Sequence, residues 1–227
     1  MVEGGKIDWA CHANDAMATI GDMLDFDDAV GVALAFYRKY PTQTLIIVTG
    51  DHETGGMTIG HASTGYTAYY DELLGQQMSF EHFGNEIFKG HKGTGLMDWD
   101  GMIGLMKDHF GLDYDQLNAW QQERLEAAYE LSMTGENKRG DYSRESTSGS
   151  TNRLIYGGYE PIIVTLTQVL NERASIGWTS YMHTGVPVPV YAQGRQADMF
   201  AGFYDNTDIA KRIARIMTVR QELPIQK

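Results

Sequence analysis

The chain has 227 residues, of which 42% are hydrophobic, and its 18 basic and 30 acidic side chains give a formal net charge of -12. This composition is typical of folded globular proteins and excludes collagen-like, coiled-coil and disordered chains. No apolar run approaches the ~18 residues that a membrane-spanning helix needs. The negative charge opposes binding to nucleic acid, and the single cysteine, Cys11, excludes an internal disulfide. Abundant carboxylates and seven histidines leave divalent metal binding open.

The first residues, MVEGGKID, lack the basic start, apolar run and cleavage site of a secretory signal. Three metal-type side chains, Glu3, Asp8 and His12, nevertheless lie close to this end of the chain. Because a well-defined site needs a rigid support, we expect residues 1–3 to form the end of a strand that begins upstream. The sequence then reads as the C-terminal portion of a longer protein.

Residues 14–40 show apolar positions at helical spacing, and Pro41 predicts the end of this helix. Residues 44–49 form a short run of mostly β-branched side chains followed by Gly50. Such a run is typical of a strand that is buried on both faces of a parallel sheet. A helix followed by a buried strand predicts an α/β fold.

A second strand is predicted at residues 186–191, where two prolines favour an edge position. Residues 205–208 offer N-caps for a helix that continues to Ile216. Between the two strands, helical patterns at 97–110 and 116–131 occur without further buried strands. We therefore interpret residues 57–177 as an insertion in an α/β core made of residues 1–56 and 178–227. Within the insertion, the polar stretch 134–152 predicts an exposed, mobile loop.

At three places in the sequence a histidine lies close to the end of a predicted helix or strand. Asp8 and His12 are four residues apart, so a helix would present both to one cation; the alternative is an N-cap and a surface histidine. Asp51 and His52 directly follow the first strand, at the end where α/β sheets bind ligands; the alternative is a polar turn. His183 precedes the second strand. The remaining histidines have no partner spacing and are interpreted as surface or structural residues: His61, His82, His91 and His109.

Three segments resemble motifs of the alkaline phosphatase family. The pattern M-V-E-G-x-x-I-D-x-x-x-H-A-N-D occupies residues 1–15, and V-T-x-D-H-E-T-G-G occupies residues 48–56. A His-Thr pair followed by V-P-V-Y-A and F-x-G-x-x-D-N-T occupies the span 183–207. The order and spacing resemble the C-terminal half of that family, with residues 57–177 in the place of its variable crown region.

The resemblance implies a mostly parallel sheet flanked by helices, with a crown-like insertion. It implies that Asp8, His12 and His183 hold one zinc ion, that Asp51 and His52 hold a second, and that Glu3 serves a magnesium ion. Such a centre stabilises the attacking and leaving oxygens of phosphoryl transfer. The parent enzyme would hydrolyse phosphate monoesters through a phosphoserine, form a homodimer and act in the periplasm or outside the cell.

Three catalytic elements of the family have no counterpart in these residues: the serine nucleophile in its D-S-A/T segment, a metal-bridging aspartate and a phosphate-clamping arginine. We therefore assign no catalytic residue and expect the chain alone to be inactive. Two alternatives stay open: a related metallo-phosphodiesterase or mutase, and a non-catalytic zinc-binding interaction module. The E-T-G-G continuation and Glu3 favour the phosphatase.

Overall fold

The computed structural model describes residues 1–94, 98–134 and 147–219. The chain divides into two compact units. Unit 1 contains Met1–Leu24 and Thr54–Thr184, and unit 2 contains Asp25–Glu53 and Gly185–Lys227. The predicted insertion, residues 57–177, lies wholly within unit 1, and the predicted division into core and insertion stays a prediction.

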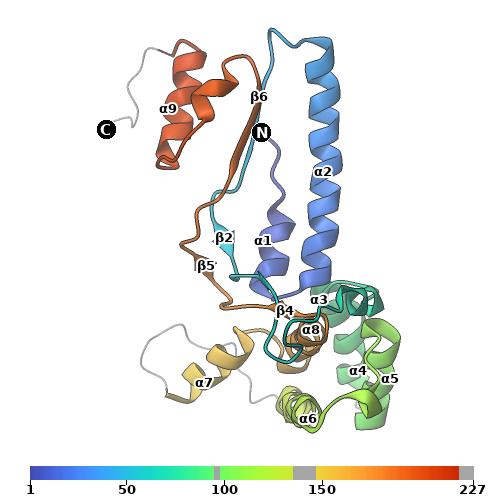
Figure 1. Cartoon of the computed structure of the whole chain (residues 1–227). Coiled ribbons are helices and arrows are strands. Elements are labelled where there is room, and N and C mark those ends of the chain that lie inside the picture. The colour runs from blue at the N-terminus through green and yellow to red at the C-terminus, as the bar shows by residue number, and fades with distance from the viewer. Residues whose placement is uncertain (95–97, 135–146, 220–227) are drawn as a thin grey trace. The chain divides into compact units, whose positions relative to one another are not determined.

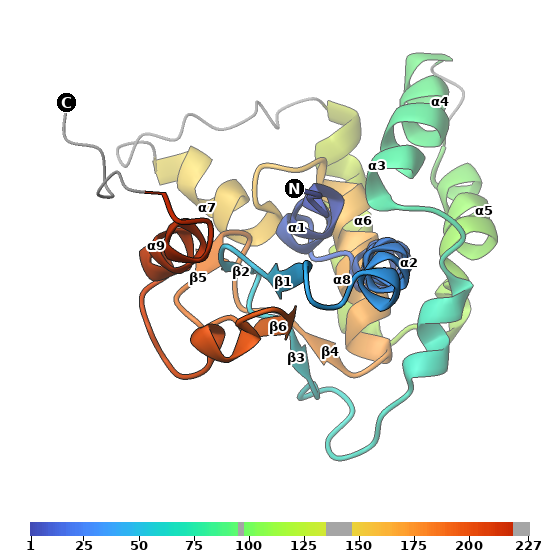
Figure 2. The same cartoon turned by 90° about the horizontal axis from the view of Figure 1, so that it is seen from above.

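Unit 1 is mainly helical (Figures 1 and 2). The described part of its chain begins with α1 and the first half of α2 and continues through short helices, two short strand pairs and three longer helices. In chain order the elements from α1 to β5 that lie in or enter this unit are α1 (Gly5–His12), α2 (Ala16–Lys39), β2 (Glu53–Thr54), β3 (Thr58–Ile59), η1 (Tyr70–Gly75), α3 (Phe80–His82), η2 (Phe83–Phe88), α4 (Lys89–Thr94), α5 (Trp99–Phe110), η3 (Tyr114–Gln116), α6 (Ala119–Thr134), α7 (Thr147–Tyr156), α8 (Pro161–Arg173), β4 (Ile176–Gly177) and β5 (His183–Thr184).

Helix α8 forms the centre of unit 1, and α6 packs along it (Figure 2). Pro161 occupies its first turn, where a missing N–H costs nothing, and the Ser132 hydroxyl accepts a hydrogen bond from the Ile162 amide at 3.0 Å. Nearly every position of α8 is buried, and its buried polar side chains Thr165, Thr167 and Asn171 are hydrogen-bonded. The core around it consists of fully buried side chains from η2, α5, α6 and α8, among them Phe83, Phe88, Met102, Met106, Phe110, Leu125, Ile162, Leu166 and Leu170.

Unit 2 contains the second half of α2, an antiparallel strand pair and a C-terminal helix. Strand β1 (Leu45–Thr49) pairs with β6 (Val190–Gly194) in the register Leu45↔Gly194 to Thr49↔Val190. The chain continues through η4 (Ala197–Phe200) to α9 (Thr207–Ile216). The Asp205 carboxylate accepts a hydrogen bond from the Thr207 amide at 2.9 Å, which confirms the predicted start of this helix.

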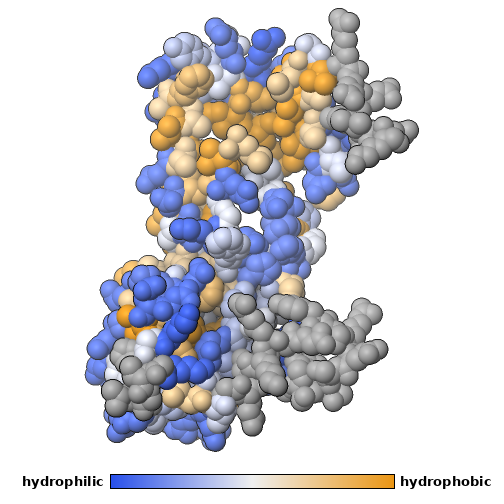
Figure 3. All heavy atoms as spheres, turned by 180° about the vertical axis from the view of Figure 1, so that it is seen from behind, coloured by the Kyte–Doolittle hydropathy of each residue, from blue (hydrophilic) through white to orange (hydrophobic). Residues whose placement is uncertain are grey.

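Unit 2 leaves many apolar side chains uncovered. Figure 3 shows a broad apolar surface in the upper part of the view, which unit 2 forms. Its exposed large hydrophobic residues include Val32, Phe36, Tyr40, Val186, Tyr191 and Phe203. Among the described residues, no helix combines the length and the apolar character needed to cross a membrane.

Several predicted elements differ from the structure. The strand expected at residues 186–191 begins only at Val190, because Pro187 and Pro189 lack the N–H that a strand ladder needs. The two strand pairs whose register is known, β1 with β6 and β3 with β4, are antiparallel, so the described residues do not confirm the expected mostly parallel sheet. Residues 1–4 form no strand. Most of the predicted loop at 134–152 lies outside the described residues, but its end is helical, in α7.

Candidate metal centre

Helix α1 presents two predicted ligands from one turn. Asp8 and His12 are one helical turn apart, and the Asp8 Oδ1 and His12 Nε2 atoms are separated by 3.4 Å. The helix ends at His12, Ala13 caps it, and the next residue, Asn14, has a φ of 52°. Asparagine tolerates this left-handed conformation better than most residues, so the chain can turn sharply and begin α2.

Strand β5 brings the third predicted ligand to the same place. The His183 Nε2 atom lies 3.1 Å from His12 Nε2 and 3.8 Å from Asp8 Oδ1. The ligand atoms of these three residues all lie within 4.8 Å of one another. We call Asp8, His12 and His183 the ligand cluster. All three residues belong to unit 1.

The dimensions of the ligand cluster fit a zinc ion. When ligand atoms lie at about 2.0–2.1 Å from a tetrahedral zinc ion, they are about 3.3 Å from one another. The three observed separations, 3.1, 3.4 and 3.8 Å, scatter around this value. Two imidazole nitrogens and one carboxylate oxygen are also ligands that zinc accepts.

The tautomer of His12 is suited to metal binding. Its Nδ1 atom lies 2.6 Å from the carbonyl oxygen of Tyr181. A carbonyl can only accept, so Nδ1 carries the proton and the neutral ring presents a lone pair at Nε2, toward His183. Tyr181 is itself fixed: its hydroxyl contacts the Gln168 amide and the Ile155 carbonyl, and burial raises the pKa of that hydroxyl.

Asp8 has an outer partner that the sequence did not indicate. The buried Thr54 hydroxyl donates to Asp8 Oδ1 at 2.5 Å. Residues that hydrogen-bond a metal-binding carboxylate fix its orientation and tune its affinity for the ion.

The ligand cluster is open on one side. The Asp8 and His12 side chains are 33% and 23% exposed, and the His183 side chain is 50% exposed. Three protein ligands with an accessible remaining position are typical of catalytic zinc sites, where water or substrate takes the fourth place. A structural zinc site would instead be closed by four protein ligands.

The other predicted ligands are not members of the ligand cluster. Glu3 is exposed, precedes α1 and is not part of the cluster. Asp51 and His52 follow β1 in unit 2, as predicted. Their side chains contact each other, with His52 Nε2 at 3.4 Å from Asp51 Oδ2, and the His52 amide donates to Asp51 Oδ1 at 3.2 Å.

Three of the four remaining histidines have structural surroundings. His61 pairs with the Ser63 hydroxyl at 2.7 Å, His82 is exposed at the end of α3, and the His109 ring packs against Phe83. The side chain of His91 lies outside the described part of the structure.

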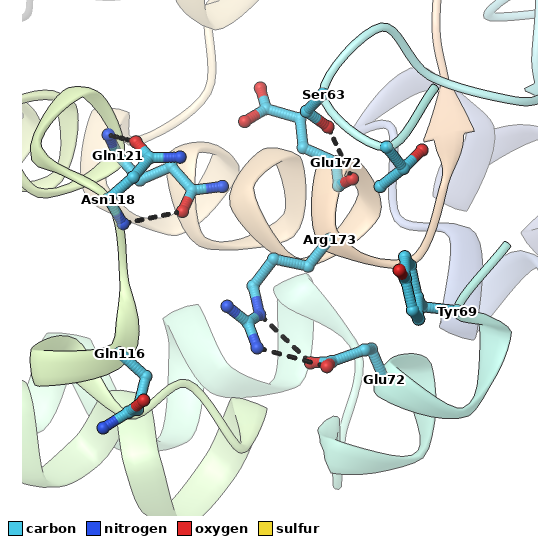
Figure 4. A pocket seen from close by; sticks show the side chains of 9 residues that line it. Ser63, Tyr69, Glu72, Gln116, Asn118, Gln121, Glu172 and Arg173 are labelled. Atoms are coloured by element: carbon cyan, nitrogen blue, oxygen red, sulfur yellow. Dashed lines mark hydrogen bonds and ion pairs between the residues drawn. The ribbon is translucent and has the colours of Figure 1, made fainter. Parts of the chain in front are cut away.

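A separate pocket of about 300 Å³ opens in unit 1 (Figure 4). Its lining contains no member of the ligand cluster. The Arg173 guanidinium is paired with Glu72 at 3.0 and 3.1 Å, and Asn118 and Gln121 cap each other across the start of α6. Because this arginine is already neutralised by a carboxylate, the pocket is a poor candidate for phosphate binding.

Comparison with known proteins identifies the family. The family model for alkaline phosphatase matches residues 1–219. Alkaline phosphatase 4 of Bacillus subtilis is 31% identical over 219 residues, which are 96% of this chain and 39% of that protein. The repressible alkaline phosphatase of Saccharomyces cerevisiae is 26% identical over 221 residues, covering 93% of this chain and 35% of the relative.

Solved structures agree with these matches. A cold-active alkaline phosphatase from a psychrophilic Shewanella species superposes with a TM-score of 0.67 and 29% identity, over 95% of this chain and 44% of that structure. The alkaline phosphatase of Thermus thermophilus gives a TM-score of 0.64 and 26% identity, over 100% and 44%. The chain therefore spans less than half the length of these relatives and has an alkaline-phosphatase-like α/β fold. With the family model covering nearly all of its residues, the chain belongs to the alkaline phosphatase family.

Proposed function

We propose that this chain is the metal-binding portion of an alkaline phosphatase whose whole protein hydrolyses phosphate monoesters through a two-zinc centre and a phosphoserine intermediate. The observation that carries the proposal is the ligand cluster: two imidazole nitrogens and a carboxylate oxygen converge at zinc-like separations, with one side open. A zinc ion bound there would polarise a phosphoryl oxygen and acidify a bound water.

The chain's own residues have distinct roles in this proposal. Asp8 and His12 orient one ion from a rigid helical turn, and His183 completes the set from β5. The Tyr181 carbonyl holds the His12 proton on Nδ1, and the Thr54 hydroxyl orients the Asp8 carboxylate. These contacts direct the His12 Nδ1 proton to the Tyr181 carbonyl and leave Nε2 facing the position of the ion.

The proposed ligands of the other two ions rest on the family resemblance. We assign Asp51 and His52 to a second zinc ion and Glu3 to a magnesium ion. These assignments give the second zinc two protein ligands and the magnesium one within this chain, fewer than the three or more that zinc sites usually have. We therefore place the missing ligands, the serine nucleophile and the phosphate-clamping arginine in the rest of the protein, and we expect the chain alone to be inactive.

Three further properties of the whole protein are proposed from its family. We expect a mostly parallel sheet in which β1 is one strand, assembly as a homodimer, and action in the periplasm or outside the cell. The uncovered apolar surface of unit 2 supports the first of these, because a buried sheet is covered on both faces.

The test is zinc content by elemental analysis together with p-nitrophenyl phosphate turnover, on the purified chain and two variants. His183→Ala removes a cluster ligand, and His82→Ala removes an exposed histidine of the same unit. We expect about one zinc ion in the wild type and in His82→Ala, none in His183→Ala, and no turnover in any sample. Zinc-dependent turnover by the chain alone would contradict the assignment of the nucleophile to the rest of the protein. Equal zinc content in all three samples would contradict the ligand cluster.

A further inference from the structure

The segment that leads into His183 is held by three consecutive carbonyl groups. The Ser180 carbonyl accepts from the Asn14 side-chain amide at 2.9 Å, and the Tyr181 carbonyl accepts from His12 Nδ1 at 2.6 Å. The Met182 carbonyl accepts from the Gly55 amide at 3.0 Å. His183 is the next residue. Its backbone position is therefore determined by donors from two other parts of unit 1.

Asn14 supplies one of these donors from a buried position. Its side chain is 4% exposed, and the same Nδ2 atom also donates to the Cys11 carbonyl at 3.0 Å. The amide thus bridges the end of α1, which carries Asp8 and His12, and the segment that carries His183. The left-handed backbone at Asn14, with a φ of 52°, is the conformation in which both bonds are formed.

Other contacts hold the same turn without touching the His183 segment. The Asn171 side chain donates to the Asn14 carbonyl at 2.5 Å, and the Thr167 hydroxyl, which donates to the Val164 carbonyl of its own helix at 2.9 Å, lies 3.4 Å from the Ala13 carbonyl. Both come from α8, and both partners are carbonyls of the turn. These contacts fix the turn on the core of unit 1, whereas the Asn14 amide fixes the turn relative to Ser180.

We infer that Asn14 is a positioning residue for the metal centre: by bridging the Cys11 and Ser180 carbonyls it sets the separation between the α1 ligands and His183. The inference rests on the proposed metal function. His12 makes the neighbouring bond to Tyr181, but His12 is itself a ligand. Asn14 lies outside the ligand cluster, and its side chain donates to carbonyls of both ligand-bearing segments, Cys11 at the end of α1 and Ser180 before β5.

The test uses Co²⁺ as the probe, because the visible spectrum of this ion reports its coordination number and geometry. The first variant, Asn14→Gly, keeps the left-handed backbone accessible and removes only the amide. The second, Asn14→Asp, keeps the side-chain shape but cannot donate to either carbonyl. Its added negative charge would by itself strengthen cation binding, so weaker binding has to come from the lost bonds. The matched control, Thr167→Val, loses the hydroxyl that bonds Val164 and contacts the Ala13 carbonyl of the same turn, and it leaves Ser180 untouched.

We expect Asn14→Gly and Asn14→Asp to bind Co²⁺ and Zn²⁺ about 10- to 100-fold more weakly than the wild type, the range found for outer-shell positions, with a Co²⁺ spectrum altered from tetrahedral. Thr167→Val should keep the wild-type affinity and spectrum, even if thermal unfolding shows it to be as destabilised as the Asn14 variants. Wild-type affinity and spectrum in both Asn14 variants, or the same loss in Thr167→Val, would overturn the inference and leave the metal centre standing. Absence of Co²⁺ binding in the wild type would overturn the metal centre itself, and the inference with it.

Discussion

Removal of Arg124 from its ion pair with Glu172 is predicted to destabilise unit 1 strongly. The Arg124 guanidinium donates to Glu172 Oε1 at 2.6 Å and to Gln168 Oε1 at 2.7 Å, and it stacks on Trp120 with its Cζ 4.3 Å from the ring centre. The Glu172 side chain, at the pocket of Figure 4, is 10% exposed, and its Oε2 atom is buried with no hydrogen-bond partner among the described residues. Arg124 therefore supplies the positive charge that balances this buried carboxylate.

Arg124→Met keeps an unbranched apolar stem against Trp120 but leaves the Glu172 carboxylate uncompensated. Breaking a buried ion pair in this way costs roughly 3–5 kcal/mol. Because the Arg124 side chain is 24% exposed and water can approach it, we expect the lower end, about 3 kcal/mol. Replacing both partners, in Arg124→Met with Glu172→Gln, should restore a large part of the loss, since no buried charge then remains.

Urea unfolding measures these differences, provided that the slope with denaturant concentration stays unchanged. Lys107→Met is the matched control, because Lys107 also pairs with a carboxylate, that of Asp113 at 3.3 Å, but with both side chains largely exposed. Lys107→Met should lower the free energy of unfolding by less than about 1 kcal/mol. If Arg124→Met lowers the free energy of unfolding by no more than Lys107→Met does, the uncompensated charge of buried Glu172 does not destabilise the fold, and the reasoning is refuted.

The remaining predictions concern a buried carboxyl and the ligand cluster. Burial raises the pKa of Asp15 above its ordinary value of 3.8 despite bonds from the Ala18 and Phe80 amides and Gln76. When folding raises the pKa of a carboxyl, the protonated carboxyl adds to the free energy of unfolding below the unfolded-state pKa. This contribution is lost as the pH rises through the folded-state pKa. Urea unfolding of the wild type should therefore show stability falling from about pH 4 upward relative to Asp15→Asn; parallel pH profiles would contradict this. Thr54→Val should weaken zinc binding about 10-fold in a chelator competition, and unchanged affinity would remove Thr54 from the metal centre. Zinc at about 100 times its Kd should stabilise the wild type by about 2.7 kcal/mol, seen as a rise in Tm that His183→Ala lacks; an equal rise in both would place the ion elsewhere.

The elements that could be predicted from sequence are those with strong local signals. The helix predicted at 14–40 is observed as Ala16–Lys39, because Pro41 cannot continue a helix and the residue before it is driven to extended conformations. The run of β-branched residues gave β1 within one residue. The pairing direction could not be predicted, since an apolar run is compatible with either parallel or antiparallel neighbours. The second strand was misplaced because the apolar valines that alternate with Pro187 and Pro189 resemble a strand, although the prolines lack amide donors.

In the candidate site, too, the ligands could be predicted from local sequence patterns, whereas their hydrogen-bond partners depend on the tertiary fold. The four-residue spacing predicted that Asp8 and His12 share one face of a helix, and α1 places their side-chain atoms 3.4 Å apart. His183 was found through its position before a strand and through the family motif, and β5 brings it into the cluster. The contributions of Thr54 and the Tyr181 carbonyl could not be predicted, because a backbone acceptor has no side-chain signature and a threonine hydroxyl in a glycine-rich turn has many possible partners.

The central claim, that the ligand cluster binds zinc through two imidazoles and a carboxylate, is tested most directly by X-ray absorption at the zinc edge of the zinc-loaded chain and of His183→Ala. We expect nitrogen and oxygen atoms at about 2.0–2.1 Å from the zinc ion. Outer-shell scattering should come from two imidazoles in the wild type. In His183→Ala, any zinc that still binds at high zinc concentration should show scattering from one imidazole. A sulfur shell at about 2.3 Å, which would indicate Cys11 as a ligand, or an oxygen-only shell without imidazole scattering would contradict the claim.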